Sequence, residues 1–66
     1  MKIIFNGESV ELSDSISVEA FIASRKLDPA KVLVEYNSRI IDRAEWPGII
    51  LRNADNVFVL SFVGGG

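Results

Sequence analysis

The sequence predicts an α+β fold, a mixed sheet of four to five strands with one helix packed across one face. The chain has 66 residues, which is the length of one small domain. Its β-prone runs lie on both sides of a single stretch with helical spacing of apolar residues. Hydrophobic residues make up 48% of the chain, enough to form a core, and without cysteine no disulfide can support it.

The first 12 residues predict a β-hairpin. Two short β-prone runs, 2–6 and 8–12, are joined by Asn6-Gly7. Asn-Gly is typical of two-residue hairpin turns, because both turn positions need a positive φ angle. Alternation then places four apolar side chains on one face: Ile3, Phe5, Val10 and Leu12. Ile4 points to the other face.

One helix is predicted from Val18 to about Lys26. The Ser17 hydroxyl can cap its first turn by accepting a hydrogen bond from a free backbone N–H group. An apolar stripe follows the i, i+3, i+4 spacing: Val18, Phe21 and Ile22. Arg25 and Lys26 are expected in the last turn, where the helix dipole favours cations. Asp28-Pro29 is expected to end the helix, because a residue before proline avoids the α region.

The second half of the chain predicts the remaining strands. Residues 32–36 and 39–41 read as a strand and a short partner, and residues 57–63 are the longest β-prone run. Between them, residues 42–48 look irregular, with Asp42 opening a helical turn, and residues 49–52 look like a short extended piece. One helix covers only one face of such a sheet. With the first and last strands parallel at its centre, this arrangement is the β-grasp, the fold of ubiquitin. We expect residues 1–62 to form this domain and residues 63–66 a flexible glycine-rich tail.

The last strand is apolar on both faces. Val57 and Val59 fit one face, and three larger side chains fit the other: Phe58, Leu60 and Phe62. One interpretation is a fully buried strand, but too little chain remains to cover a second face. We therefore favour an exposed apolar patch that a partner protein binds, joined by Ile4 from the first strand.

Composition excludes several function classes. The chain has neither cysteine nor histidine, so it offers no thiol nucleophile and no imidazole base. We expect a protein that is not an enzyme and holds no bound cofactor. A net charge of −2 and a pI near 4.9 argue against nucleic-acid binding. No stretch reaches membrane-spanning length and no targeting segment is visible, so we expect a protein of the cytoplasm.

The terminal glycines, Gly64, Gly65 and Gly66, suggest a different kind of chemistry. Glycine lacks Cβ, so this segment can enter a narrow channel. Four residues beyond Phe62 span about 13 Å when extended. A terminal carboxylate has a pKa near 3.5 and is a poor electrophile once ionised, so ATP-dependent adenylation is needed before it reacts. A frayed terminus or a cloning remnant is the alternative interpretation of such glycines alone.

The whole chain resembles the ThiS family of sulfur carriers in bacterial thiamine biosynthesis. The resemblance begins with the strand and turn of residues 1–7. It continues through residues 37–46, where Asn37, an apolar pair, Arg43 and Trp46 stand at the family's spacing. It ends with residues 62–66. Two positions depart from the usual pattern: Ala54-Asp55 stands where Gly-Asp is common, and Asp42 where proline is common. The first departure suggests a different turn in which Asp55 still bonds local backbone.

The resemblance implies a function for the tail. Gly66 would be adenylated by a ThiF-like adenylyltransferase that uses ATP and Mg²⁺, and then converted to a thiocarboxylate. The sulfur would come from cysteine through a desulfurase and pass to the thiazole synthase ThiG. Gly64 and Gly65 would be threaded into the partner enzymes.

Other interpretations remain open. A molybdopterin-synthase small subunit would use the same sulfur chemistry. A ubiquitin-like modifier would be joined to lysines, and a β-grasp binding module would have no terminal chemistry. Four residues near the centre of the resemblance could contact partners, but we favour structural roles: Tyr36, Asn37, Arg43 and Trp46. On that interpretation Trp46 closes the open end of the core and Arg43 pairs with a nearby carboxylate.

Overall fold

The computed structural model describes residues 1–62, so the predicted tail, residues 63–66, lies outside the described residues. The elements in chain order are β1 (Lys2–Phe5), β2 (Glu8–Glu11), α1 (Val18–Ser24), the 3-10 turn η1 (Pro29–Lys31), β3 (Val32–Tyr36), β4 (Arg39–Ile41), the 3-10 helix η2 (Arg43–Gly48) and β5 (Asn56–Ser61).

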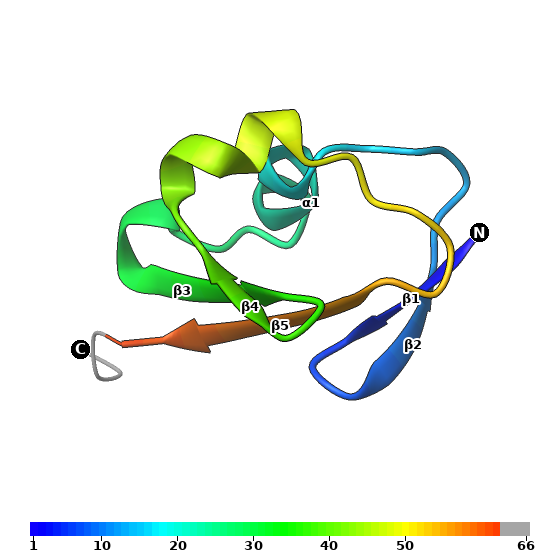
Figure 1. Cartoon of the computed structure of the whole chain (residues 1–66), viewed down its shortest axis with the longest axis horizontal. Coiled ribbons are helices and arrows are strands. Elements are labelled where there is room, and N and C mark those ends of the chain that lie inside the picture. Colours follow the sequence, from blue (N-terminus) through cyan, green and yellow to red (C-terminus); the bar gives the residue numbers. More distant parts are fainter. Residues whose placement is uncertain (63–66) are drawn as a thin grey trace.

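The five strands form one mixed sheet in the order β2-β1-β5-β3-β4. β1 runs parallel to β5, and the other neighbouring strands are antiparallel. Both α1 and η2 lie on the same side of the sheet (Figure 1). The predicted α+β fold and the central parallel pair are therefore confirmed.

The first hairpin forms as its turn residues predict. Asn6 and Gly7 have φ angles of 49° and 84°, so both adopt the conformation that an Asn-Gly turn favours. Asn6 has a second role, because its side chain pairs with the backbone of Val59 on β5. Val59 N donates to Asn6 Oδ1 at 2.8 Å, and Asn6 Nδ2 donates to the Val59 carbonyl at 3.3 Å. This amide extends the β1–β5 ladder beyond the end of β1.

Helix α1 begins as predicted but ends earlier. Ser17 Oγ accepts a hydrogen bond from Ala20 N at 3.0 Å, as expected of an N-cap. The predicted end near Lys26 is wrong, because the helix stops at Ser24 and Lys26 turns to a φ angle of 60°. Leu27 N then donates to the Ile22 carbonyl, and Lys26 N to the Ala23 carbonyl. These two bonds form a Schellman motif, which ends the helix before Asp28-Pro29 is reached.

The early end of α1 also corrects the expectation for Arg25 and Lys26. Both residues follow the last helical turn, which contains no basic residue. The Arg25 guanidinium instead lies 4.9 Å from the centre of the Phe5 ring and 5.6 Å from that of Phe21. Contact with the faces of two aromatic rings stabilises the cation at this position.

Residues 49–52 are not a strand of the sheet. Ile50 makes one isolated bridge with Ser17. Val18 N donates to the Ile49 carbonyl at 2.8 Å, and Leu51 N to the Ile16 carbonyl at 2.9 Å. The segment therefore lies against the residues that lead into α1, and Leu51 is completely buried.

The core lies between the sheet and the layer formed by α1 and η2. The predicted stripe of the helix is buried, as are the inward side chains of the strands. The buried residues are Ile3, Val18, Phe21, Ile22, Val32, Val34, Ile41, Trp46, Leu51, Val57 and Val59. Trp46 of η2 is 2% exposed, which confirms that it closes the core. Among residues 1–62, no group accepts a hydrogen bond from its buried Nε1 atom.

We predict that the ring of Trp46, and not its N–H group, carries its contribution to stability. Trp46→Phe removes an unpaired buried donor, whose desolvation costs about 1–3 kcal/mol, but leaves a small cavity. The two effects oppose each other, so the free energy of unfolding of the Trp46→Phe variant should stay within about 1 kcal/mol of the wild-type value. Trp46→Ala should lose about 3–5 kcal/mol. Urea unfolding followed by circular dichroism measures both, and equal losses in the two variants would contradict the assignment.

Candidate functional site

β5 presents a buried face and an exposed face. Val57 and Val59 are buried against the core. Phe58 and Leu60 point to the opposite side of the sheet, and Leu60 is 58% exposed. Because α1 and η2 both lie on the core side, no described helix covers these side chains (Figure 1). The predicted alternation is confirmed, and the alternative of a fully buried strand is wrong.

The exposed face carries a groove of about 240 Å³, which we call the sheet groove. Its lining comes from three adjacent strands: Leu33, Glu35, Ile40, Phe58 and Leu60. The register explains this set, because Leu33 lies opposite Leu60, and Glu35 lies between Phe58 and Ile40. Sequence reasoning missed Leu33 and Ile40. Their alternation with buried Val32, Val34 and Ile41 was the signal that could have found them.

Ile4 and Phe62 lie outside the lining of the sheet groove. Ile4 is half-buried and lies opposite Asn56, at the start of β5, in a depression shared with Lys2, Asn53 and Ala54. Phe62 follows β5, and its side chain is 64% exposed. Its backbone N–H donates to the Lys31 carbonyl at 3.1 Å. The structure thus brings together only Phe58 and Leu60 of the four predicted residues.

Asp55 holds the turn that precedes β5. Its carboxylate accepts hydrogen bonds from Tyr36 Oη at 2.7 Å, Asn37 Nδ2 at 3.2 Å and Arg52 N at 2.8 Å. Asn37 Oδ1 also accepts from Asn56 N at 2.8 Å. These contacts confirm structural roles for Tyr36 and Asn37, and the expected bond from Asp55 to local backbone. Ala54 has a φ angle of 72°, a region that favours glycine.

The Asp55 network shifts the pKa values of two of its members. Desolvation raises the pKa of Asp55, but the hydrogen bonds from Arg52, Tyr36 and Asn37 outweigh it and hold the pKa below its usual value. Burial raises the pKa of the Tyr36 hydroxyl above its usual value, and its bond to Asp55 raises it further. Asp55 therefore accepts these bonds as a carboxylate at neutral pH.

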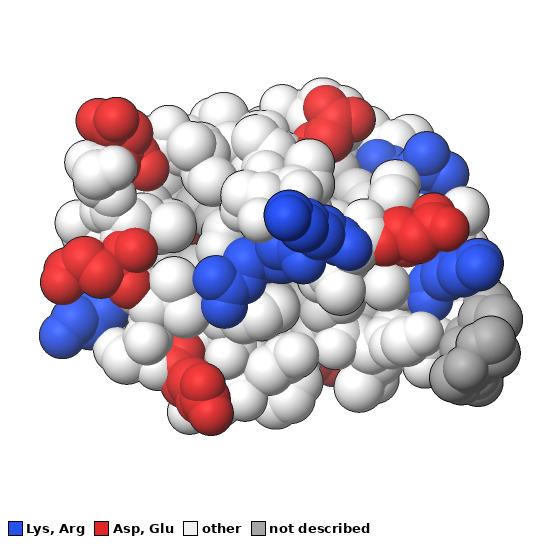
Figure 2. Space-filling model, turned by 180° about the vertical axis from the view of Figure 1, so that it is seen from behind, with Lys and Arg blue, Asp and Glu red and all other residues white. Residues whose placement is uncertain are grey.

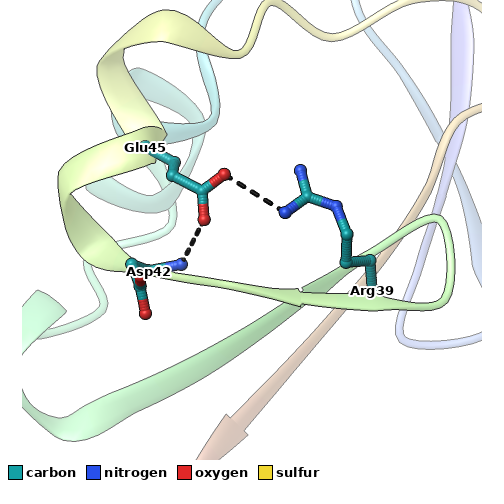
Figure 3. A network of polar contacts seen from close by, with 3 residues as sticks. All are labelled: Arg39, Asp42 and Glu45. Atoms are coloured by element: carbon teal, nitrogen blue, oxygen red, sulfur yellow. Dashed lines mark hydrogen bonds and ion pairs between the residues drawn. The ribbon is translucent and has the colours of Figure 1, made fainter.

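A second polar network fixes the start of η2. Asp42 N donates to Glu45 Oε2 at 2.8 Å, and Arg39 Nη1 lies 3.2 Å from Glu45 Oε1 (Figure 3). The backbone bond from Asp42, followed by that from Arg39, lowers the pKa of Glu45. Asp42 opens a helical turn, as predicted. Within residues 1–62, Glu45 pairs with Arg39 and no carboxylate pairs with Arg43, so the expected Arg43 ion pair is wrong there.

The predicted reactive group, Gly66, lies outside the described residues, as do Gly64 and Gly65. Among residues 1–62, no three His, Cys, Asp or Glu side chains gather in a way that could hold a metal ion.

Of the helices in this part of the chain, none is long and apolar enough to span a membrane. Acidic and basic side chains are interspersed over the side of the molecule shown in Figure 2.

Fold and sheet geometry define a ubiquitin-like β-grasp domain. The chain belongs to the ThiS family, whose model matches residues 3–66. A crystal structure of the thiamine biosynthesis protein ThiS from Geobacter metallireducens superimposes with a TM-score of 0.87 at 26% identity, covering both chains completely. A solution structure of a thiamine biosynthesis protein from the same organism has a TM-score of 0.81 at 29% identity, covering the whole chain and 88% of the other.

Two curated relatives of the chain are thiazole synthases. The chain is 33% identical over 66 residues to a thiazole synthase of Paramagnetospirillum magneticum and 32% identical to one of Magnetococcus marinus. The match covers all of this chain but only 20% of each relative. The chain thus spans about a fifth of the length of these relatives.

We predict that Asp55→Asn destabilises the fold at neutral pH and reduces its sensitivity to acid. A carboxylate whose pKa is lowered on folding stabilises the native state fully above its unfolded pKa of about 3.9, and the contribution disappears as the pH falls through the lower folded pKa. The variant should lose about 1–3 kcal/mol of unfolding free energy at pH 7. Between pH 7 and pH 3, the unfolding free energy of the variant should also fall by less than that of the wild type. Urea unfolding at both pH values measures this difference.

The matched control is Glu8→Gln, at an exposed carboxylate just after the hairpin turn. It should change stability by less than about 0.5 kcal/mol at pH 7. If the Asp55→Asn variant is as stable as this control, the Asp55 carboxylate does not stabilise the turn before β5, and the role assigned to the network is refuted.

Proposed function

We propose that this protein is a sulfur carrier for the thiazole moiety of thiamine, with Gly66 as its reactive residue. The observation that carries the proposal is the ThiS family match, which spans the β-grasp domain and extends to Gly66. The likeness to ThiS from Geobacter metallireducens over the whole length of both chains supports it.

The proposed chemistry activates a terminal carboxylate. A carboxylate oxygen of Gly66 attacks the α-phosphorus of ATP, pyrophosphate leaves, and an acyl adenylate forms. Sulfide then attacks the acyl carbon and displaces AMP, which leaves a thiocarboxylate. In this proposal a ThiF-like adenylyltransferase binds the ATP and Mg²⁺. A cysteine desulfurase supplies the sulfur as a persulfide, and a thiol reductant releases it as sulfide. The reaction is assigned to the cytoplasm, where ATP and reduced sulfur are available.

In this proposal the chain binds its partner enzymes and extends its terminal residues into them, and the partners carry out the catalysis. It lacks the thiol and imidazole groups that usually serve as nucleophile and base. Gly64 and Gly65 carry no side chains, so they suit a narrow channel in a partner. The partner is proposed to hold the exposed face of the sheet, near Ile4, Phe58, Leu60 and Phe62. We assign residues 1–62 to the domain that is held and residues 63–66 to the tail that reacts.

The proposed sulfur acceptor is the thiazole synthase ThiG. The names of the curated relatives support this acceptor, because both are thiazole synthases. They favour the thiamine pathway over a molybdopterin-synthase small subunit, which would use the same thiocarboxylate chemistry. The same names also favour a sulfur carrier over a ubiquitin-like modifier, and over a binding module without terminal chemistry.

Intact-mass measurement tests the proposed function. A chain ending at Gly66 is incubated with the ThiF-like adenylyltransferase, Mg²⁺-ATP and a sulfide source. We expect a gain equal to the replacement of one oxygen by sulfur, and only when ATP is present. The chain lacking Gly66 should show no gain, while its thermal melt stays nearly unchanged.

Three other results of these mass and melting measurements would contradict the proposed function. Isopeptide-linked adducts would favour a modifier over a carrier. No ATP-dependent change of the wild-type mass would overturn both. A large loss of thermal stability on removing Gly66 would assign the tail a structural role instead of a chemical one.

A further inference from the structure

Glu35 lies in the middle of the sheet groove. On β3 it stands opposite Phe58 of β5 on one side and Ile40 of β4 on the other. Its side chain is half-buried among the apolar lining. Within residues 1–62, its carboxylate makes no hydrogen bond or ion pair with another residue. The groove therefore combines four large exposed apolar side chains with one unpaired anion.

This combination limits what can cover the groove. A protein that buries Leu33, Ile40, Phe58 and Leu60 gains about 25 cal/mol for each Å² of apolar surface removed from water. The same protein removes water from Glu35, and a buried carboxylate is strongly destabilising unless a cation pairs with it. An occupant of the groove therefore needs an apolar surface with a basic side chain at its centre.

We propose that the sheet groove docks the ThiF-like adenylyltransferase through an apolar surface that carries an Arg or Lys, which pairs with Glu35. This inference rests on the proposed function and adds to it a specificity-determining residue on the carrier. Glu35 makes the apolar surface selective, because a purely apolar or acidic partner would leave its charge unpaired. An arginine would suit the position best, since guanidinium groups pair with carboxylates in two parallel hydrogen bonds.

A second copy of this chain fits the groove poorly. Face-to-face pairing about a two-fold axis through the middle of the groove brings the central residues of both copies together. The two Glu35 carboxylates would then approach each other, and the groove lining contains no Lys or Arg to compensate them. The net charge of −2 adds to the repulsion between copies and favours a basic partner.

Titration calorimetry with the purified ThiF-like adenylyltransferase tests the inference. We expect Glu35→Gln to weaken binding about ten- to hundred-fold, because the partner's cation loses its counter-charge. Glu35→Lys should weaken it further, since two cations would then face each other. The matched control is Glu19→Gln, an exposed carboxylate on α1 on the opposite side of the sheet from the groove, which should change the dissociation constant less than about two-fold. All variants should melt close to the wild type, because Glu35 makes no internal polar contact.

The outcomes separate this inference from the proposed function. If the wild type is converted to the thiocarboxylate and Glu35→Gln binds as tightly as the wild type, only the role of Glu35 is overturned. If the wild type neither binds the adenylyltransferase nor gains mass with ATP, the proposed function and the inference both fall. Equal weakening by Glu35→Gln and Glu19→Gln would indicate general charge attraction and would also overturn the specific pair.

Discussion

The parallel pairing of β1 with β5 organises the molecule. Ile4 N donates to the Asp55 carbonyl at 2.8 Å, Asn6 N donates to the Val57 carbonyl at 2.9 Å, and the Asn6 amide continues this ladder to Val59. Because β1 occupies one side of β5 and β3 the other, the last strand becomes the centre of the sheet. The segment that leads to the glycines is thus held by the most distant part of the chain.

The two faces of β5 differ in their surroundings: the inner face packs in the core, and the outer face is the one we propose for recognition. Val57 and Val59 pack against the core, so they contribute to folding through apolar burial. Phe58 and Leu60 point away from it and line the sheet groove. The Asp55 network fixes the turn before β5, and the bond from Phe62 N to the Lys31 carbonyl fixes its far end. A strand held at both ends presents its outer face, and the point where residues 63–66 begin, in a defined position.

Local chemistry made much of the fold predictable. Asn6-Gly7 specifies its turn, Ser17 specifies the start of α1, and the two predicted strands at residues 32–36 and 39–41 have the observed bounds. The end of α1 was not predictable in this way. It depends on Lys26, a residue with no particular preference for the left-handed conformation that it adopts.

The candidate site was only partly predictable, because it depends on register between distant strands. Phe58 and Leu60 follow from alternation within one strand. Alternation within their strands also places Leu33 and Ile40 on the outer face. Only the pairing of β3 with β5 and β4 brings them together with Phe58 and Leu60, and no local pattern specifies that pairing. Ile4 was placed on the correct face, but the register puts it opposite Asn56, away from the groove lining. The roles assigned to Gly64, Gly65, Gly66 and the partner-binding face stay predictions.

The central claim is that the outer face of β5 serves recognition and not folding. Its most direct test is the kcat/KM for ATP-dependent thiocarboxylate formation on Leu60→Ser, with the free energy of unfolding determined on the same protein. Removing an exposed apolar contact should lower kcat/KM about tenfold or more while changing stability by less than about 1 kcal/mol. An unchanged kcat/KM, or a loss of stability comparable to that of a core variant, would contradict the account.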